Sequence, residues 1–108
     1  MLKDLSRKYF LAFAKKDFQS IAGMLQRDVV IEDWGNCADG IEEARLIYEQ
    51  FFSCNSSIDI KIINMCSEGR TVMAELVLKI EGKDTLKVVD IINFTEIGKI
   101  KSIRAYKG

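Results

Sequence analysis

The chain has 108 residues, the usual size of one domain, and 48% of them are hydrophobic, which is enough to bury a core. Sixteen basic and sixteen acidic residues cancel, so no net charge favours nucleic acid or an anionic membrane as a partner. Apolar runs are far too short for a transmembrane span, and no signal peptide is recognisable at the start. We therefore expect a single soluble domain over residues 1–108, with a cytoplasmic location.

The types of residue present restrict the chemistry. Histidine is absent, and the three cysteines, Cys37, Cys54 and Cys66, form no C-x-x-C pair. Ser-His-Asp and Cys-His mechanisms are thereby excluded, and no metal site is expected. The cysteines are interpreted as ordinary reduced thiols. Any proton transfer would have to use carboxylates, tyrosines or lysines.

The first third of the chain has helical periodicity. Apolar residues at three- and four-residue spacing indicate a first helix through Leu5, Tyr9, Ala12 and Phe13. Asp17 is placed to cap a second helix, whose apolar positions are Phe18, Ile21, Ala22 and Leu25. A short β-branched strand over residues 29–31 follows and ends at Glu32-Asp33-Trp34.

A loop over residues 35–39 is predicted to lead into a third helix. Asp39 and Glu42 have the spacing of a capping box, and the apolar stripe of this helix is Ala44, Ile47, Tyr48 and Phe51. From Ile58 onward the period becomes two, with hairpin turns at 68–69, 81–83 and 97–98. The pair Ile62-Ile63 breaks the alternation, as a β-bulge would. The pattern predicts an α+β fold in which helices pack on a curved, mainly antiparallel sheet that encloses a pocket.

Asp90 is the most informative residue of the predicted sheet. One face of its strand reads Leu86, Val88, Asp90, Ile92 and Phe94, so an aspartate occupies a core position. A buried carboxylate without a partner is costly or retains its proton. It could belong to a functional pocket, to a structural hydrogen-bond network, or to a rim near solvent or a dimer interface.

The hairpin turns predict the neighbours of Asp90. A two-residue turn at 97–98 places Ala105 opposite Asp90 and Lys101 opposite Phe94, whereas the loop at 81–83 places Ala74 opposite Asp90. Two alanines beside the carboxyl would leave open volume above it. In this register Arg104 lies on the other face of the sheet.

Three further residues are candidates for the same pocket. Asp33 ends a strand, where a side chain can reach a cavity, although a turn aspartate is the simpler interpretation. Tyr9 and Tyr48 lie on the inward stripes of their helices, where each alone would usually be a core tyrosine.

The whole chain resembles the nuclear-transport-factor-2-like superfamily, and within it ketosteroid isomerase and the SnoaL-like proteins. The resemblance is carried by residues 25–33, by Asp39-Gly40, and by residues 88–94 through Gly98-Lys99-Ile100. It implies three N-terminal helices packed on a strongly curved, mixed but mostly antiparallel sheet that forms a cone around a pocket. It also implies a small hydrophobic molecule as ligand, no cofactor and no metal.

The isomerase resemblance also implies roles for particular residues. Asp33 matches the general base, Tyr9 matches the tyrosine of the oxyanion hole, and Asp90 matches the aspartic acid that remains protonated beside that tyrosine. Tyr48 matches a supporting tyrosine. Trp34, Ala74 and Ala105 are expected to complete the substrate-binding surface. The implied reaction is proton transfer that moves a C=C double bond in a carbonyl compound.

The chain departs from the isomerase pattern at Trp34, at Lys107 and in the loop over residues 33–40, which is shorter by about two residues, and other functions remain open. Trp34 stands where the isomerases have proline, and Lys107 stands where they carry a bulky aromatic, so a smaller or more polar substrate is expected. Alternatives are a non-catalytic binding domain, an enzyme of another class such as an epoxide hydrolase or cyclase, and a protein-interaction module. Val77, Val89 and Ile91 on the outer sheet face predict a homodimer through that face.

Overall fold

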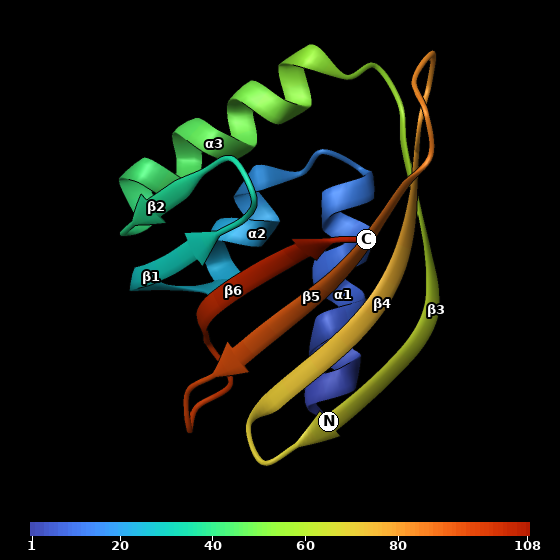
Figure 1. Ribbon diagram of the computed structural model, residues 1–108. Helices are drawn as coiled ribbons and strands as arrows, with labels where there is room; N and C mark the ends of the chain where they lie inside the picture. The colour runs from blue at the N-terminus through green and yellow to red at the C-terminus, as the bar shows by residue number, and fades with distance from the viewer.

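A computed structural model describes residues 1–108 as three helices and one six-stranded sheet. The helices are α1 (Leu2–Ala14), α2 (Phe18–Met24) and α3 (Ile41–Cys54). The strands are β1 (Leu25–Glu32), β2 (Cys37–Asp39), β3 (Ile58–Glu68), β4 (Thr71–Ile80), β5 (Leu86–Phe94) and β6 (Ile100–Lys107). Figure 1 shows α3 across one end of the curved sheet and α1 behind its long strands.

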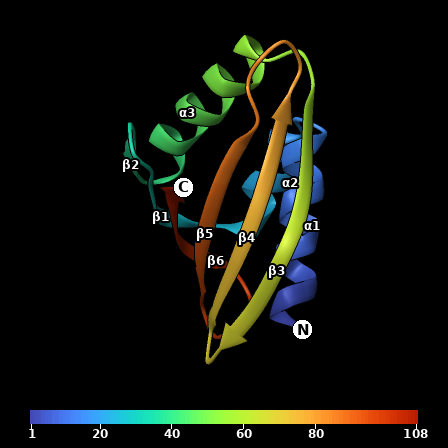
Figure 2. The ribbon, with the colours of Figure 1, turned by 45° about the vertical axis from the view of Figure 1, so that its right-hand side comes forward.

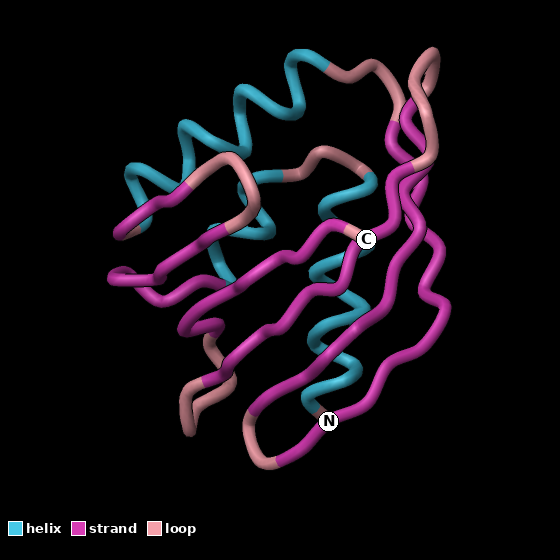
Figure 3. Tube along the Cα trace, in the orientation of Figure 1, coloured by secondary structure: helices cyan, strands magenta, loops and turns pink.

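The sheet has the order β2-β1-β6-β5-β4-β3 and is not closed. Every neighbouring pair is antiparallel except β1 and β6, which run parallel and connect the first half of the chain to its last strand. Figure 2 shows how strongly the long strands twist and bend, and the colours of Figure 3 distinguish the helices from the sheet. All three helices precede β3 in the chain. The predicted fold class, three helices on a curved and mostly antiparallel sheet, is confirmed.

The register around Asp90 is as predicted. Ala74 of β4 and Ala105 of β6 are its partners on the two sides. The prediction that Lys101 lies opposite Phe94 is wrong, because an irregularity after Asn93 pairs Phe94 with Ile100 instead. The irregularity makes Lys101 the extra residue of its strand, which a count from the turn alone does not reveal.

The predicted bulge in β3 is present. The register with β4 shifts between Ile62 and Asn64, which leaves Ile63 as the extra residue. Because of this insertion, Ile62 and Met65 both pack against the core although they are three positions apart. The bulge thus maintains an inward apolar face while the strand bends around the interior.

The helix starts agree only in part with the predicted caps. Asp17 caps α2, with its carboxylate accepting a bond from the Ser20 N–H at 3.1 Å. The predicted capping box of Asp39 and Glu42 does not form, because Gly40 is the N-cap and has no side chain. Instead, the Glu43 carboxylate accepts the Asp39 N–H at 2.8 Å. The loop predicted over residues 35–39 contains the short strand β2.

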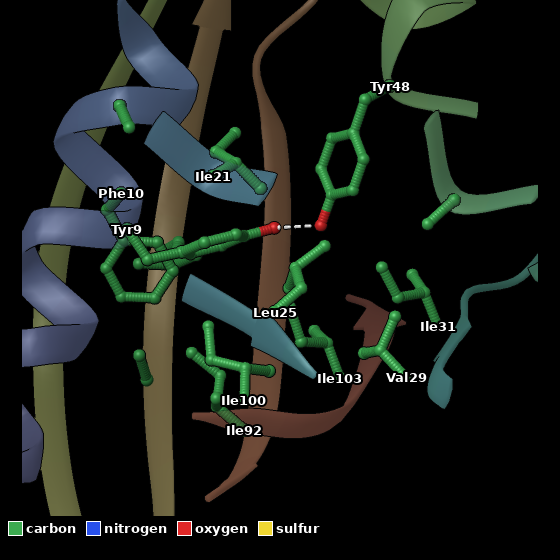
Figure 4. Packing of buried hydrophobic residues seen from close by; sticks show 14 of the residues in the cluster. Tyr9, Phe10, Ile21, Leu25, Val29, Ile31, Tyr48, Ile92, Ile100 and Ile103 are labelled. Carbon is green, nitrogen blue, oxygen red and sulfur yellow. Dashed lines mark hydrogen bonds between the residues drawn. The ribbon is translucent and has the colours of Figure 1, made fainter. Parts of the chain in front are cut away.

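The core fills the space between the concave side of the sheet and the helices. Its fully buried aliphatic members come from α2, β1, β4, β5 and β6, and include Ile21, Val29, Val72, Ile92 and Ile100. In Figure 4, Val29, Ile92 and Ile100 lie below the two tyrosines that meet between α1 and α3, whereas Ile21 lies above them. The core and the cavity described below share side chains, since Tyr9, Tyr48 and Val88 belong to both.

The three helices lack the length and the apolar run that a membrane-spanning helix requires. On the outer sheet face, Val89 is 39% exposed and its cross-strand neighbour Tyr106 is 53% exposed, whereas Val77 and Ile91 are half-buried. The homodimer expected through this face stays a prediction.

Candidate active site

A cavity of about 350 Å³ lies between the concave sheet face and the helices α1 and α3. Most of its lining is apolar, with aromatic rings from the helices facing aliphatic side chains of the strands. The helices contribute Tyr9, Phe10, Phe13, Ile47, Tyr48, Gln50, Phe51 and Cys54. The strands contribute Ile31, Glu32, Ile60, Leu76, Leu78, Leu86, Val88, Asp90, Ile103 and Ala105, and the loops add Asp33, Trp34, Asn36 and Asn55. A volume of this size suits a small organic molecule.

Two tyrosine hydroxyls meet at the inner end of this cavity. Tyr9 of α1 and Tyr48 of α3 are buried, and their oxygens lie 2.6 Å apart in a hydrogen bond (Figure 4). Burial, together with the nearby Tyr48 and Asp90, raises the pKa of Tyr9 well above its ordinary value. Burial likewise raises the pKa of Tyr48. Both phenols are therefore neutral at physiological pH and able to donate hydrogen bonds.

Asp90 is the carboxyl group close to these tyrosines. Its side chain lines the cavity, and its carboxyl oxygens, which make no hydrogen bond within the protein, are accessible from the cavity. Apolar surroundings, and secondarily the charge of Asp33, raise its pKa from 3.8 to about 7. The residue is half-buried because its carboxyl borders the cavity. Near neutral pH it is consequently present in both protonation states.

Asp33 approaches the cavity from the loop after β1, and a tight turn fixes its carboxylate. Its Oδ1 accepts the backbone N–H groups of Gly35 at 2.8 Å and Asn36 at 2.7 Å, and the Asn36 side-chain amide at 3.3 Å. Its Oδ2 has only one long contact, 3.4 Å to the same amide. One oxygen thus anchors the group, and the other is available to a molecule in the cavity.

The structure brings six of the seven predicted site residues to one cavity. Asp33, Tyr9, Asp90, Tyr48, Trp34 and Ala105 all line it, and Trp34 remains 53% exposed. Ala74 does not line this cavity: it is fully buried in β4 opposite Asp90, and neighbouring side chains cover it. Its contact with substrate stays a prediction.

The sequence interpretation missed several polar residues of the lining. Gln50 and Cys54 lie on the same stripe of α3 as Ile47 and Phe51, so the helical period alone could have identified them. Asn36 could not have been identified in this way, because its place depends on the turn that holds Asp33.

The lining also limits other chemistry. No lysine or arginine contributes to it, so an Asp-Arg-Asp arrangement of the epoxide-hydrolase type is absent. No group of three or more His, Cys, Asp or Glu side chains is arranged to hold a metal ion. The cavity therefore has neutral hydrogen-bond donors, the two tyrosines, at its inner end and the Asp33 carboxylate on its wall.

Comparison with known proteins places this architecture in the NTF2-like fold. An NTF2-like protein of unknown function from Cytophaga hutchinsonii matches with a TM-score of 0.83 and 18% identity over 100% of this chain and 90% of that one. The SnoaL-like domain model matches residues 6–103, and the chain belongs to this SnoaL-like family.

Two further structures indicate the range of functions described for this fold. SalBIII, an epoxide hydrolase/cyclase-like enzyme in pyran ring formation in salinomycin, has a TM-score of 0.86 and 21% identity over 99% of this chain and 90% of its own. A proposed ketosteroid isomerase from Kribbella flavida has a TM-score of 0.86 and 16% identity over 99% and 77%. No curated protein matches the sequence closely. Such low identities establish the fold alone.

Proposed function

We propose that this protein is a ketosteroid-isomerase-like enzyme, which moves a C=C double bond in a small apolar carbonyl compound by proton transfer without a cofactor. The proposal is carried by one observation: a carboxylate with a free oxygen, two neutral phenols and a carboxyl of raised pKa border the same apolar cavity. These are the groups that a base and an oxyanion hole require.

In the proposed reaction, the substrate carbonyl oxygen lies at the inner end, beside Tyr9 and Asp90. Oδ2 of Asp33 takes a proton from the carbon next to the carbonyl, and electrons shift onto the oxygen to form a dienolate. Tyr9 and the protonated form of Asp90 donate hydrogen bonds to that oxygen, and Tyr48 holds the Tyr9 hydroxyl. Asp33 then returns the same proton to the γ-carbon, so substrate and product are isomers.

The lining also favours a particular kind of substrate. Its walls are mainly aromatic and aliphatic, which suits a flat molecule with a large apolar surface. At the end of β6, the exposed Lys107 stands where the isomerases that the chain resembles carry a bulky aromatic, so that part of their apolar wall is missing. A compound of two or three rings is therefore a better candidate than a complete steroid.

An ultraviolet assay tests the proposal by following conversion of a β,γ-unsaturated ketone into its conjugated isomer. A 5-ene-3-ketosteroid and a two-ring analogue would each be tested with the wild type and Asp33→Asn. We expect turnover of at least one substrate, reduced by about a hundredfold or more in the variant, because the base is lost. Folded wild-type protein that gives no turnover above buffer with either ketone would contradict the proposal.

A further inference from the structure

The charges that border the cavity all have the same sign. Glu32, Asp33 and Asp90 contribute carboxyl groups to the lining, and no basic side chain contributes to it. The chain as a whole has equal numbers of acidic and basic residues, so this imbalance is local. An anion in the cavity would meet repulsion from these groups, whereas a cation would be attracted.

Two lysines contact Asn55 of the lining and are engaged in hydrogen bonds there. Lys16 donates to the backbone oxygens of Phe52 at 3.3 Å and Asn55 at 2.7 Å, and Lys83 donates to the Asn55 side chain at 2.8 Å. Arg104 is exposed, on the opposite face of the sheet from Ile103 and Ala105. None of them neutralises the carboxyl groups inside the cavity.

Aromatic rings supply a second feature that favours cations. Six of the lining side chains are aromatic: Tyr9, Phe10, Phe13, Trp34, Tyr48 and Phe51. The faces of such rings attract ammonium groups, most strongly where water is excluded. Asp90 lies close to two of these rings, and its carboxyl oxygens are accessible from the cavity and unbonded within the protein, so it can act as counter-charge.

We propose that the cavity binds organic cations that carry an apolar ring system, with Asp90 and Asp33 as counter-charges and the aromatic rings as the surface that contacts the ammonium group. This inference goes beyond the proposed isomerisation and does not rest on it. The isomerase reaction uses a neutral ligand and protonated Asp90, whereas a cation selects the ionised form of the same carboxyl.

This difference predicts how binding depends on pH. The titratable groups facing Asp90 are Tyr9 from α1, Tyr48 from α3 and Asp33 from the loop after β1, and its cross-strand neighbours are Ala74 and Ala105. Both phenols stay neutral, so Asp90 is the group that titrates in the neutral range. Affinity for a permanent cation should therefore increase between pH 5.5 and 8.5 by about tenfold.

The test uses three probes that share one ring system and differ in charge. They are (2-naphthylmethyl)trimethylammonium, 2-naphthylmethanol and 2-naphthoate, and calorimetric titration at pH 8 gives their dissociation constants. We expect the ammonium probe to bind about tenfold or more tightly than the alcohol, and the carboxylate to bind most weakly. The quaternary probe keeps its charge at every pH, so any pH dependence belongs to the protein.

Variants identify the groups responsible. Asp90→Asn and Asp33→Asn should each reduce the preference for the ammonium probe over the alcohol by about fivefold or more. Asp59→Asn, which removes an exposed carboxylate from β3 outside the cavity, should leave the preference unchanged. If Asp90→Asn does not fold, Asp33→Asn and the pH dependence of the wild type provide the same test.

The proposal is overturned if the wild type binds the alcohol as tightly as the ammonium probe, or if a preference for the cation survives unchanged in the folded carboxyl variants. Isomerase activity is measured separately, so a protein that turns over ketones but ignores the cation would refute this inference alone. A protein that binds the cation but never isomerises ketones would refute the proposed function alone.

Discussion

Asp90 is an ionisable group in a core position, a combination that ordinary core residues avoid. It occupies an inward position between alanines of β4 and β6, and no protein group hydrogen-bonds to it. Such a position destabilises the ionised form, which is why its pKa is raised to about 7. A position that reduces stability at neutral pH is typical of a functional group rather than a structural one.

The destabilisation of the fold by ionised Asp90 leads to a prediction for Asp90→Asn. Between pH 4 and 7 the folded wild type binds a proton that the unfolded chain releases, so its stability decreases as the pH increases through that range. Asparagine does not titrate, so the variant does not lose stability in this way as the pH increases. We expect it to be more stable than the wild type by about 2–4 kcal/mol at pH 8, with the difference disappearing below about pH 4.

Urea denaturation of both proteins at pH 4, 6 and 8 provides the measurement. A stability difference that is constant with pH would contradict the placement of Asp90 in an apolar site.

At the scale of single elements, the last turn of α3 is held by side chains from elsewhere in the chain. Lys16, in the turn after α1, donates to two backbone oxygens of this turn, and Lys83 of the β4–β5 hairpin donates to the Asn55 side chain. The Asn55 amide in turn donates to the Phe51 oxygen at 2.7 Å. Because Phe51, Cys54 and Asn55 line the cavity, these lysines also position its wall.

Removing the cap should loosen this end of the helix. Lys16→Met keeps the apolar stem but loses the hydrogen bonds and the favourable charge at the helix C-terminus, so the free energy of unfolding should decrease by about 1–2 kcal/mol. Its exposed neighbour gives the control, since Lys15→Met should change the value by less than about 0.5 kcal/mol. Equal effects of the two substitutions in thermal or urea unfolding would show that Lys16 does not cap α3.

Local patterns explain which elements could be predicted from the sequence. Asp90 and its two alanine neighbours follow from strand alternation and turn length, and the bulge at Ile63 follows from a break in that alternation. The strand β2 has three residues, too few for a periodic signal. Two features depend on packing between segments that are distant in the sequence: the parallel pairing of β1 with β6, and the contact between Tyr9 and Tyr48. No local pattern predicts them, and only the resemblance to a family implied them.

At the scale of the whole molecule, the outer sheet face has no assigned role. Val89 and Tyr106 are paired across β5 and β6 and exposed on it. Beside them, Asn93 bonds to Thr71 at 2.6 Å and to Ser102 at 2.9 Å, so these polar side chains satisfy one another. A face of this kind could be covered by the same face of a second copy, in a symmetric contact.

We predict that the protein is a homodimer through this face and that Val89→Glu weakens the dimer by placing charge at its centre. Light scattering coupled to size exclusion should give twice the mass of one chain for the wild type and a lower mass for the variant at equal concentration. Leu46→Glu, on the exposed side of α3, introduces the same charge away from the sheet and should have no effect. A monomeric wild type at high concentration would contradict the prediction.

The central claim is that Asp33 removes a proton from carbon next to a carbonyl group, and deuterium exchange tests it without requiring the natural substrate. 2-Tetralone, an apolar two-ring ketone, would be incubated in D₂O with wild type, with Asp33→Asn and with buffer alone, while ¹H NMR follows loss of its α-proton signals. We predict exchange well above the buffer rate with the wild type, and a decrease in the catalysed rate of about a hundredfold or more in the variant. Exchange at the buffer rate with folded wild type, or equal rates for both proteins, would contradict the claim.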